Sequence, residues 1–337
     1  MYQADIEKLK GFIESSQRIL ICSHSSPDGD AVGSMLAVHN YLINSSLINK
    51  DITLVLPDSC PEYLSFLPNI SLILNYQDNK DIIRDKFNSA QLIFAVDFNE
   101  PNRLGEMGNL FCTSNATKIA IDHHPFTSAI YYNLVFVDEN ASAAAELVYL
   151  VLQELNIAEF NFDTAISIYT GIITDTGSLS YNCNSNRVYS ILADIMKFNI
   201  DAREVHDLIY NNFPSGRIKL LAYILYNKLV INEKHVFAYF SLTKKELEEY
   251  NYQEGYLEGV VNYALNIRGI KLAASFVERN NLTKISFRSK GNVDVNDLAV
   301  KYFNGGGHKN AAGANYYESI ENAIKLFIEL ANVYTCE

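Results

Sequence analysis

The sequence lacks the cysteine pairs and long apolar runs that mark several large classes of protein. Its five cysteines are scattered and show no Cys-x-x-Cys spacing, so neither a disulfide framework nor a zinc knuckle is predicted. No stretch reaches the roughly 18 uninterrupted apolar residues of a membrane span, and no basic start precedes an apolar block as in an export signal. We therefore expect a cytoplasmic protein with no membrane partner.

The chain is also poor in positive charge. Lys and Arg number 27 against 39 Asp and Glu, which gives a formal net charge of −12. Proteins that track long nucleic acids usually present a basic face, and this chain as a whole would repel a polyanion. A short anionic ligand is easier to accommodate. Excess carboxylate also suits a site for hard divalent cations, although an acidic surface that serves only solubility explains most such charge.

The composition and length indicate two folded domains. The 337 residues exceed most single cores, and a hydrophobic content of 48% with 20% charged residues excludes a disordered chain. Residues 199–216 end in a polar stretch with Pro and Gly that suits a hinge. We predict a first domain over 1–195, a linker over 196–216 and a second domain over 217–337.

Short apolar runs rich in β-branched residues alternate with helical patterns in the first domain. Such runs are typical of buried parallel strands, and strands that alternate with helices form right-handed βαβ units. The predicted fold class is therefore α/β, with a doubly wound, mainly parallel sheet and a second, smaller α/β domain. The strands expected in the first domain are 18–23, 51–56, 71–74, 91–96, 118–121 and 134–137, and the helices include 31–43 and 141–156. In the second domain we expect strands over 236–242, 271–278 and 284–288, and helices over 217–229, 254–267, 295–303 and 319–333.

Polar side chains gather where the first apolar strand stops. In an open parallel sheet, ligands bind beyond the carboxyl ends of the strands. His24, Asp28 and Asp30 fall within seven residues after this strand. Gly29 lets the backbone turn tightly between the two carboxylates, and Asp30 has the position and side chain of a helix N-cap. A capped turn with a solvated acid is the alternative for this segment taken alone.

Further acids end two later strands and a helix. Asp97 follows the fourth strand, and the triplet Asp122-His123-His124 follows the fifth. A single Asp at a strand end is more often a turn residue, but Asp-His-His after a buried strand is costly unless its polar groups find partners. Asp175 ends an apolar helical stretch and carries little weight alone.

Together these clusters place two or three imidazoles and five carboxylates at one edge of the predicted sheet, which is more than one ion needs. Two ions about 3.5–4 Å apart, bridged by a carboxylate and a water or hydroxide, would use them. Nitrogen and carboxylate ligands suit Mn²⁺, and Mg²⁺, Co²⁺ or Fe²⁺ also fit, whereas zinc is less expected without thiolates. The sequence therefore predicts a site for two divalent cations.

The second domain offers candidates for binding phosphate. The segment 303–313 is rich in glycine and contains Gly306, Gly307 and His308, and its backbone N–H groups could cradle a phosphate. A flexible loop with an incidental histidine is the alternative. Arg288 ends a predicted strand with a guanidinium that could bind phosphate bidentately.

An arginine of the first domain is a similar candidate. Arg103 lies six residues after Asp97. Like Arg288, it could contact a phosphate or extend into solvent, and the sequence does not separate these alternatives.

The combination of these motifs resembles the DHH/DHHA1 phosphoesterases over almost the whole chain. The residues that carry the resemblance are His24-x3-Asp28-x-Asp30, Asp97, Asp122-His123-His124, Asp175 in Thr-Asp-Thr-Gly, and the C-terminal Gly-Gly-Gly-His. Among stand-alone members of this length, the chain looks most like the oligoribonuclease and pAp-phosphatase group (NrnA-like). That group trims short RNA fragments from the 3′ end and removes the 3′-phosphate of adenosine 3′,5′-bisphosphate (pAp).

The resemblance implies a role for each of these positions. Asp97 would bridge two ions, Asp122 would orient the ligands, and His124 would touch the scissile phosphate or assist the leaving group. The other ligands would be His24 and Asp28 for one ion, and Asp30, His123 and Asp175 for the other. The group that would bind the rest of the nucleotide consists of Arg288, Gly306, Gly307 and His308. Asn304 departs from the pattern, since many relatives have a further glycine there.

The function implied by the resemblance is manganese-dependent hydrolysis of short oligoribonucleotides and of pAp, by attack of a metal-activated hydroxide on phosphorus. The expected partners are a small nucleotide or short RNA and a second copy of the chain in a homodimer. The rival activity is hydrolysis of a cyclic dinucleotide such as c-di-AMP, or of its linear product pApA. The rival from another class is a nucleotide-binding sensor without catalysis.

Overall fold

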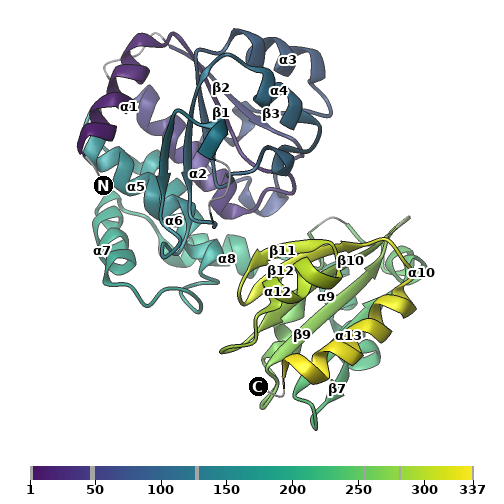
Figure 1. Ribbon diagram of the computed structural model, residues 1–337. Coiled ribbons are helices and arrows are strands. Elements are labelled where there is room, and N and C mark those ends of the chain that lie inside the picture. Colours follow the sequence, from purple (N-terminus) through teal and green to yellow (C-terminus); the bar gives the residue numbers. More distant parts are fainter. Residues whose placement is uncertain (1–2, 46–49, 126–128, 254, 281, 336–337) are drawn as a thin grey trace. The chain divides into compact units, whose positions relative to one another are not determined.

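The computed structural model describes residues 3–45, 50–125, 129–253, 255–280 and 282–335. The chain divides into unit 1, Met1–Asn212, and unit 2, Phe213–Glu337, each built on its own six-stranded sheet (Figure 1). Among the described residues, no helix is long and apolar enough to cross a membrane.

The sheet of unit 1 is parallel throughout, with strand order β3-β2-β1-β4-β5-β6. This confirms the predicted doubly wound α/β fold. The chain direction along the sheet reverses between β1 and β4, and such a switch point opens a crevice at the carboxyl ends of the two strands. The strands are β1 (Arg18–Cys22), β2 (Asp51–Leu56), β3 (Ile73–Asn75), β4 (Leu92–Val96), β5 (Thr117–Asp122) and β6 (Leu134–Val137).

One helix of unit 1 is buried along nearly its whole length. In α2 (Gly29–Ile43) every residue from Gly29 to Leu42 is buried, because α5 and α6 pack on it. Glycine allows the close approach: a Cβ on Gly33 would lie 2.5 Å from the Ser167 carbonyl oxygen of α6. The other helices of unit 1 are α1 (Gln3–Ser15), α3 (Lys80–Ser89), α4 (Gly108–Thr113), α5 (Ala144–Leu155), α6 (Phe162–Asp175), α7 (Asn186–Ile195) and α8 (Ala202–Tyr210), with short 3-10 turns η1 to η5.

The predicted linker 196–216 contains the boundary between the units, but much of it is helical. α8 occupies its middle, and Val205 and Ile209 pack into the core of unit 1. A hinge action for this segment stays a prediction.

Unit 2 has a mixed sheet with strand order β11-β12-β10-β9-β8-β7, in which only β8 and β9 pair in parallel. Phenylalanines dominate its core, where the Phe327 ring of α13 contacts Phe237, Phe276 and Phe287. The strands are β7 (Val230–Asn232), β8 (Phe237–Leu242), β9 (Leu272–Glu278), β10 (Thr283–Ser289), β11 (Gly305–His308) and β12 (Ala311–Tyr316). The helices are α9 (Ser215–Tyr223) with the π-helical η6 (Ile224–Lys228), α10 (Lys244–Glu249), α11 (Val260–Leu265), α12 (Val295–Tyr302) and α13 (Ile320–Tyr334).

The glycine-rich segment 303–313 forms most of a β-hairpin and is therefore not the irregular loop that the sequence left as an alternative. β11 pairs antiparallel with β12 at the edge of the sheet. Glycine is needed because the strands lie very close: a Cβ on Gly305 would lie 2.1 Å from the Gly313 carbonyl oxygen. A run of glycines has low strand propensity, which is why the sequence pattern did not predict these strands.

Candidate metal centre

The predicted ligands of unit 1 come together at the switch point of its sheet. The loops after β1, β4 and β5 and the end of α6 bring them into three groups, in which one nitrogen or oxygen of each member lies within 4.8 Å of the others. We call the whole set the acid–imidazole cluster. The groups are His24, Asp28 and Asp97; Asp30, His123 and Asp175; and Asp97, Asp122 and His124.

The cap of α2 differs from the predicted one. Asp28, not Asp30, is the N-cap: its carboxylate accepts hydrogen bonds from the N–H groups of Asp30 and Ala31, each at 3.0 Å. The prediction was wrong because the helix already begins at Gly29, where a Cβ would lie 2.4 Å from the Thr174 side chain. Asp30 therefore lies in the first turn of α2, and its side chain accepts hydrogen bonds from the start of another helix.

That other helix is α5. The Asp30 carboxylate accepts hydrogen bonds from the N–H groups of Ala144 at 2.6 Å and Ala145 at 2.9 Å, which are free donors at the start of a helix. It also accepts from the Ser34 hydroxyl at 3.1 Å. Each carboxylate oxygen has two lone pairs, so these bonds leave room for a metal bond. Asp30 is thus held rigidly while it faces His123, whose Nε2 lies 3.8 Å away.

Two histidines are oriented as metal ligands require. The Nδ1–H of His24 donates to the Ser25 carbonyl at 2.8 Å, and that of His123 donates to the Ala141 carbonyl at 3.3 Å. Each ring then presents Nε2 to the cluster, and a backbone acceptor on the other nitrogen fixes the tautomer that ligates a metal. The Nε2 atoms lie 3.3 Å and 3.5 Å from the two oxygens of Asp97.

The electrostatics of the two rings differ. Burial lowers the pKa of His24, against the opposing charge of Asp28, which favours the neutral imidazole that a metal binds. Burial also acts to lower the pKa of His123, but the carboxylates of Asp175 and Asp30 outweigh it and raise that pKa. His123 therefore lies among negative charges that a cation would also neutralise.

Asp97 combines a left-handed backbone with a buried carboxylate that lacks a hydrogen bond on one oxygen within the described part of the chain. Its backbone has φ +62°, a left-handed conformation that is uncommon for non-glycine residues, although Asp adopts it more readily than most. Its Oδ1 is buried and accepts no hydrogen bond from any described residue, and the same is true of Asp122 Oδ2. Burial and the carboxylates of Asp30 and Asp28 raise the pKa of Asp97 well above its usual range. Buried carboxylates in this state fit divalent cations, which would supply the missing partners.

Asp122 and His124 form a separate pair beside Asp97. The Nδ1–H of His124 donates to Asp122 Oδ1 at 2.8 Å, and its backbone N–H donates to the same oxygen at 3.2 Å. Burial acts to raise the pKa of Asp122, but the hydrogen bond and charge of His124 outweigh it and lower that pKa. Asp122 is therefore positioned to orient the His124 ring, whose side chain is 22% exposed.

Arg103 borders this centre through its backbone. It lies exposed in η3 (Pro101–Met107), and its carbonyl accepts a hydrogen bond from the Ser25 N–H at 2.8 Å. The structure thus brings its chain segment next to the His24 loop.

Three of the four predicted phosphate-binding residues of unit 2, Arg288, Gly306 and His308, share one face of its sheet, and Gly307 lies on the other. Arg288 on β10 and His308 on β11 both pair in register with Ala311 of the strand between them. Directly paired residues of antiparallel strands point to the same face, and Gly306, two residues before His308, lies on that face too. The Arg288 Nη1 donates to the Phe287 carbonyl at 2.9 Å, and the Gly307 N–H donates to Asn296 Oδ1 at 2.9 Å.

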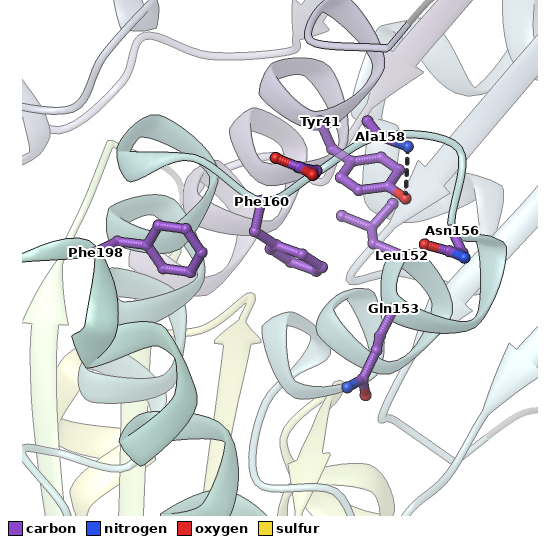
Figure 2. Close-up of a pocket in the computed structure, with 8 residues that line it drawn as sticks. Tyr41, Leu152, Gln153, Asn156, Ala158, Phe160 and Phe198 are labelled. Atoms are coloured by element: carbon purple, nitrogen blue, oxygen red, sulfur yellow. Dashed lines mark hydrogen bonds between the residues drawn. The ribbon is translucent and has the colours of Figure 1, made fainter.

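A cavity elsewhere in unit 1 contains none of the predicted residues (Figure 2). Its volume is about 350 Å³, and aromatic side chains form part of its wall. Tyr41, which lines it, lies near the opposite end of α2 from Asp28, roughly 20 Å along the helix axis. The lining residues are Tyr41, Leu152, Gln153, Asn156, Ala158, Glu159, Phe160 and Phe198.

Sequence analysis missed the residues that support the cluster. Glu146 is fully buried and accepts hydrogen bonds from Ser142 and Arg187. Gly171 of α6 lies against Asp30, since a Cβ there would be 2.9 Å from Asp30 Oδ1. Sequence signals existed in a lone Glu directly after an alanine-rich run and in a glycine within the apolar helical stretch that ends at Asp175, but neither indicates its distant partner.

The fold and the cluster define a two-unit α/β protein with a candidate divalent-metal centre at a sheet switch point. Comparison with known families agrees: the DHH family N-terminal domain matches residues 18–172, and the DHHA1 domain matches residues 232–333. The chain belongs to the DHH family.

Individual relatives resemble the chain over nearly its whole length. A Streptococcus mutans protein described as a probable bifunctional oligoribonuclease and PAP phosphatase NrnA is 27% identical over 95% of this chain and 96% of its own length. The crystal structure of an exopolyphosphatase-related protein from Bacteroides fragilis is 32% identical, with a TM-score of 0.92 over 99% of this chain and 97% of that one. The cyclic-di-AMP phosphodiesterase GdpP of Bacillus subtilis is 26% identical over 93% of this chain and 48% of its own length.

Proposed function

We propose that this protein is a manganese-dependent phosphoesterase that shortens oligoribonucleotides of a few residues from the 3′ end and removes the 3′-phosphate of pAp. The observation that carries the proposal is the acid–imidazole cluster, where buried oxygens of Asp97 and Asp122 accept no hydrogen bond from any described residue. The similarity to a protein described as an oligoribonuclease and PAP phosphatase supports the substrate class.

The ligands divide between two ions around Asp97. His24 and Asp28 would hold one ion with Asp97, in agreement with the grouping of their side chains. Asp30, His123 and Asp175 would hold the other. Asp97 would bridge the two, since its Oδ2 faces the His24 Nε2 at 3.3 Å and its Oδ1 faces the His123 Nε2 at 3.5 Å. Mn²⁺ suits this mixture of imidazole and carboxylate ligands, and Mg²⁺, Co²⁺ and Fe²⁺ are the other candidates.

When bound, two such cations lower the pKa of a water molecule and neutralise charge that develops on the phosphoryl oxygens. The protein's part is to place a proton donor and to hold the substrate. His124 carries a proton on Nδ1 that Asp122 holds, so its Nε2 is the atom we assign to the scissile phosphate or leaving oxygen. Asp122 would then act by fixing the orientation of the His124 ring.

Short substrates fit the charge of the protein. A net charge of −12 opposes binding of a long polyanion, whereas a nucleotide needs only a few positive contacts. In unit 1 we assign such a contact to Arg103. In unit 2 we assign Arg288, Gly306, Gly307 and His308 to the far phosphate or the base, because the first and last of these lie on one face of the sheet. We also propose that the protein acts in the cytoplasm as a homodimer.

The test is Mn²⁺-dependent release of product from pAp, a 5′-labelled RNA trimer, a 24-mer, pApA and c-di-AMP. Each substrate is given to the wild type, to Asp97→Ala and to Asp81→Ala, a control acid in α3 whose side chain is 85% exposed. We expect turnover of pAp and the trimer, survival of the 24-mer, and loss of activity in Asp97→Ala alone. Nucleotide binding without hydrolysis of any substrate would contradict the enzymatic proposal and favour a sensor.

Hydrolysis of c-di-AMP or pApA is the second candidate function, favoured by the similarity to GdpP. The same ligand set would serve it, so the metal centre does not separate the two activities. The ratio of kcat/KM for pAp to that for c-di-AMP decides between them, because pApA is itself a two-residue oligoribonucleotide and would be cleaved by either enzyme. We expect a ratio above one, and a strong preference for c-di-AMP would replace our assignment.

A further inference from the structure

A buried carboxylate outside the metal centre ties one side of that centre to α7. Glu146, in the first turn of α5, is fully buried. Its Oε2 accepts hydrogen bonds from the N–H and the hydroxyl of Ser142, both at 2.7 Å, and its Oε1 accepts one from the Arg187 Nε–H. Arg187 also pairs with Asp138 at 2.9 Å. We call Asp138, Ser142, Glu146 and Arg187 the Glu146 network.

The segment held by this network is the one that contacts two candidate metal ligands. Residues 141–145 lie just before Glu146, and four of the five are alanine. Their backbone groups make the contacts: the N–H groups of Ala144 and Ala145 bind the Asp30 carboxylate, and the Ala141 carbonyl binds the His123 ring. Since alanine side chains cannot direct a backbone by hydrogen bonding, the polar anchors of this segment are Ser142 and the residues that bind it.

We infer that Glu146 and Arg187 are positioning residues for the metal centre. They fix segment 141–145 so that Asp30 and His123 face the cation site, although neither residue belongs to the groups that could ligate a metal. Hydrogen-bond partners that hold a metal ligand in place typically change metal affinity or activity about 10–100-fold when they are removed. The inference rests on the proposed metal centre. It adds the two residues that hold Asp30 and His123 in position there.

Glutamine cannot replace Glu146 in this network without rearrangement. Two Ser142 donors and one Arg187 donor meet the two carboxylate oxygens of Glu146. A glutamine amide has one acceptor oxygen and one NH₂ group, so its NH₂ would face a donor on one of the two sides. Glu146→Gln therefore changes the hydrogen bonding of the segment while it preserves the volume of the side chain.

Unit 2 contains a matched control with the same chemistry. Glu246 of α10 accepts hydrogen bonds from the N–H and hydroxyl of Thr243 at 2.8 and 2.9 Å, and pairs with Lys228 at 2.8 Å. In the described parts of the chain, Glu246 belongs to no group that could hold a metal. Glu246→Gln thus damages a comparable helix start without affecting the metal centre.

The experiment is calorimetric titration of the metal-free full-length protein with Mn²⁺, in the absence of substrate, beside thermal unfolding of the same samples. We expect Glu146→Gln to weaken Mn²⁺ binding about 10–100-fold, and Arg187→Lys, which keeps the charge, to weaken it less. Glu246→Gln should lower the unfolding temperature but leave Mn²⁺ affinity within about twofold of wild type, because it contacts no part of the centre.

The outcomes separate a positioning role from a structural one. If Glu146→Gln unfolds at a lower temperature but binds Mn²⁺ like the wild type, the inference is overturned. If Glu146→Gln does not fold, Arg187→Lys is tested instead: a lower unfolding temperature with the Mn²⁺ affinity of the wild type would overturn the inference. Weakened Mn²⁺ binding supports the inference even if the wild type hydrolyses no nucleotide, in which case only the proposed function fails. If the wild type itself binds no Mn²⁺, both proposals are wrong.

Discussion

Two carboxylates, Asp97 in unit 1 and Glu246 in unit 2, differ in how far the protein's own groups stabilise their negative charge. Glu246 accepts hydrogen bonds from Thr243, Lys228 and Tyr223. Burial acts to raise the pKa of Glu246, but Lys228 and the Thr243 N–H outweigh it and lower that pKa to about 2. Burial and neighbouring acids instead raise the pKa of Asp97, whose Oδ1 accepts no hydrogen bond from the described residues. The protein stabilises the charge of Glu246, whereas it disfavours the charge of Asp97, which a bound cation would stabilise.

The largest effect of a single substitution is expected at Asp97. Asp97→Asn should lower kcat/KM for pAp on the order of 10³-fold or more, because a bridging ligand supports several kcal/mol of transition-state stabilisation. The same change should leave the metal-free protein as stable as the wild type or more stable, because it removes one charge from a buried, like-charged cluster. Chemical denaturation in EDTA measures the second effect, with Asp81→Asn as the exposed control. A large loss of stability would show that the cluster is structural.

Cations should stabilise unit 1 through the cluster. Mn²⁺ at 100 times its Kd should raise the unfolding free energy by about 2.7 kcal/mol for each ion bound, since a ligand that binds only the folded state stabilises it by mass action. Thermal unfolding with and without Mn²⁺ measures the shift. In Asp97→Asn the shift should be smaller at the same Mn²⁺ concentration. An equal shift in both proteins would place the bound ions outside the cluster.

Glu246 should respond to pH in the direction set by its lowered pKa. A carboxyl group whose folded pKa lies below its unfolded value adds stability above the unfolded pKa and loses it as the pH falls through the folded pKa. As the pH falls from about 4.5 to about 2, unit 2 should therefore lose roughly 1–2 kcal/mol after allowance for solvent screening. Urea denaturation of the wild type and Glu246→Gln across this range measures the difference. A difference that does not change with pH would contradict this account of the capped helix.

The smallest effects are expected in the glycine-rich hairpin, where two neighbouring glycines differ. Gly307 has φ +151°, and a Cβ there would lie 2.5 Å from the Ala311 carbonyl oxygen, so Gly307→Ala should distort the hairpin. Gly306 has room for a Cβ, whose nearest neighbour, Asn296 Oδ1, would lie at an ordinary contact distance of 3.8 Å. We expect Gly306→Ala to fold normally and to raise KM for pAp only a few-fold, or about 1 kcal/mol, with kcat unchanged. A fall in kcat with constant KM would contradict the assignment of this hairpin to substrate binding.

The sequence was sufficient for the parts of the fold that depend on local pattern. Each strand of the unit 1 sheet was predicted from an apolar run, although β3 begins at Ile73 and not at residue 71. Because parallel strands end at one edge, the same pattern predicted that side chains after β1, β4 and β5 would meet. Asp175 was placed correctly at the end of a helix, and the fold alone brought it to the others.

Contacts between distant segments were not predictable in this way. Arg187 binds Glu146 from 41 positions away, and no periodicity in either segment indicates the partner. The cap of α2 was assigned to the wrong aspartate because Asp28 and Asp30 lie only two residues apart, and either could be the cap until the first helical residue is known. The hairpin at 305–316 escaped prediction because its glycines carry no β-propensity, and the sheet edge supplies the pairing.

The most direct test of the central claim is the location of bound cations in crystals grown with Mn²⁺. Anomalous scattering at the manganese edge should give two peaks about 3.5–4 Å apart, on either side of the Asp97 carboxylate. One should contact His24 and Asp28, and the other Asp30, His123 and Asp175. A map without peaks among these side chains, from crystals of a protein that still hydrolyses pAp, would contradict the two-metal account.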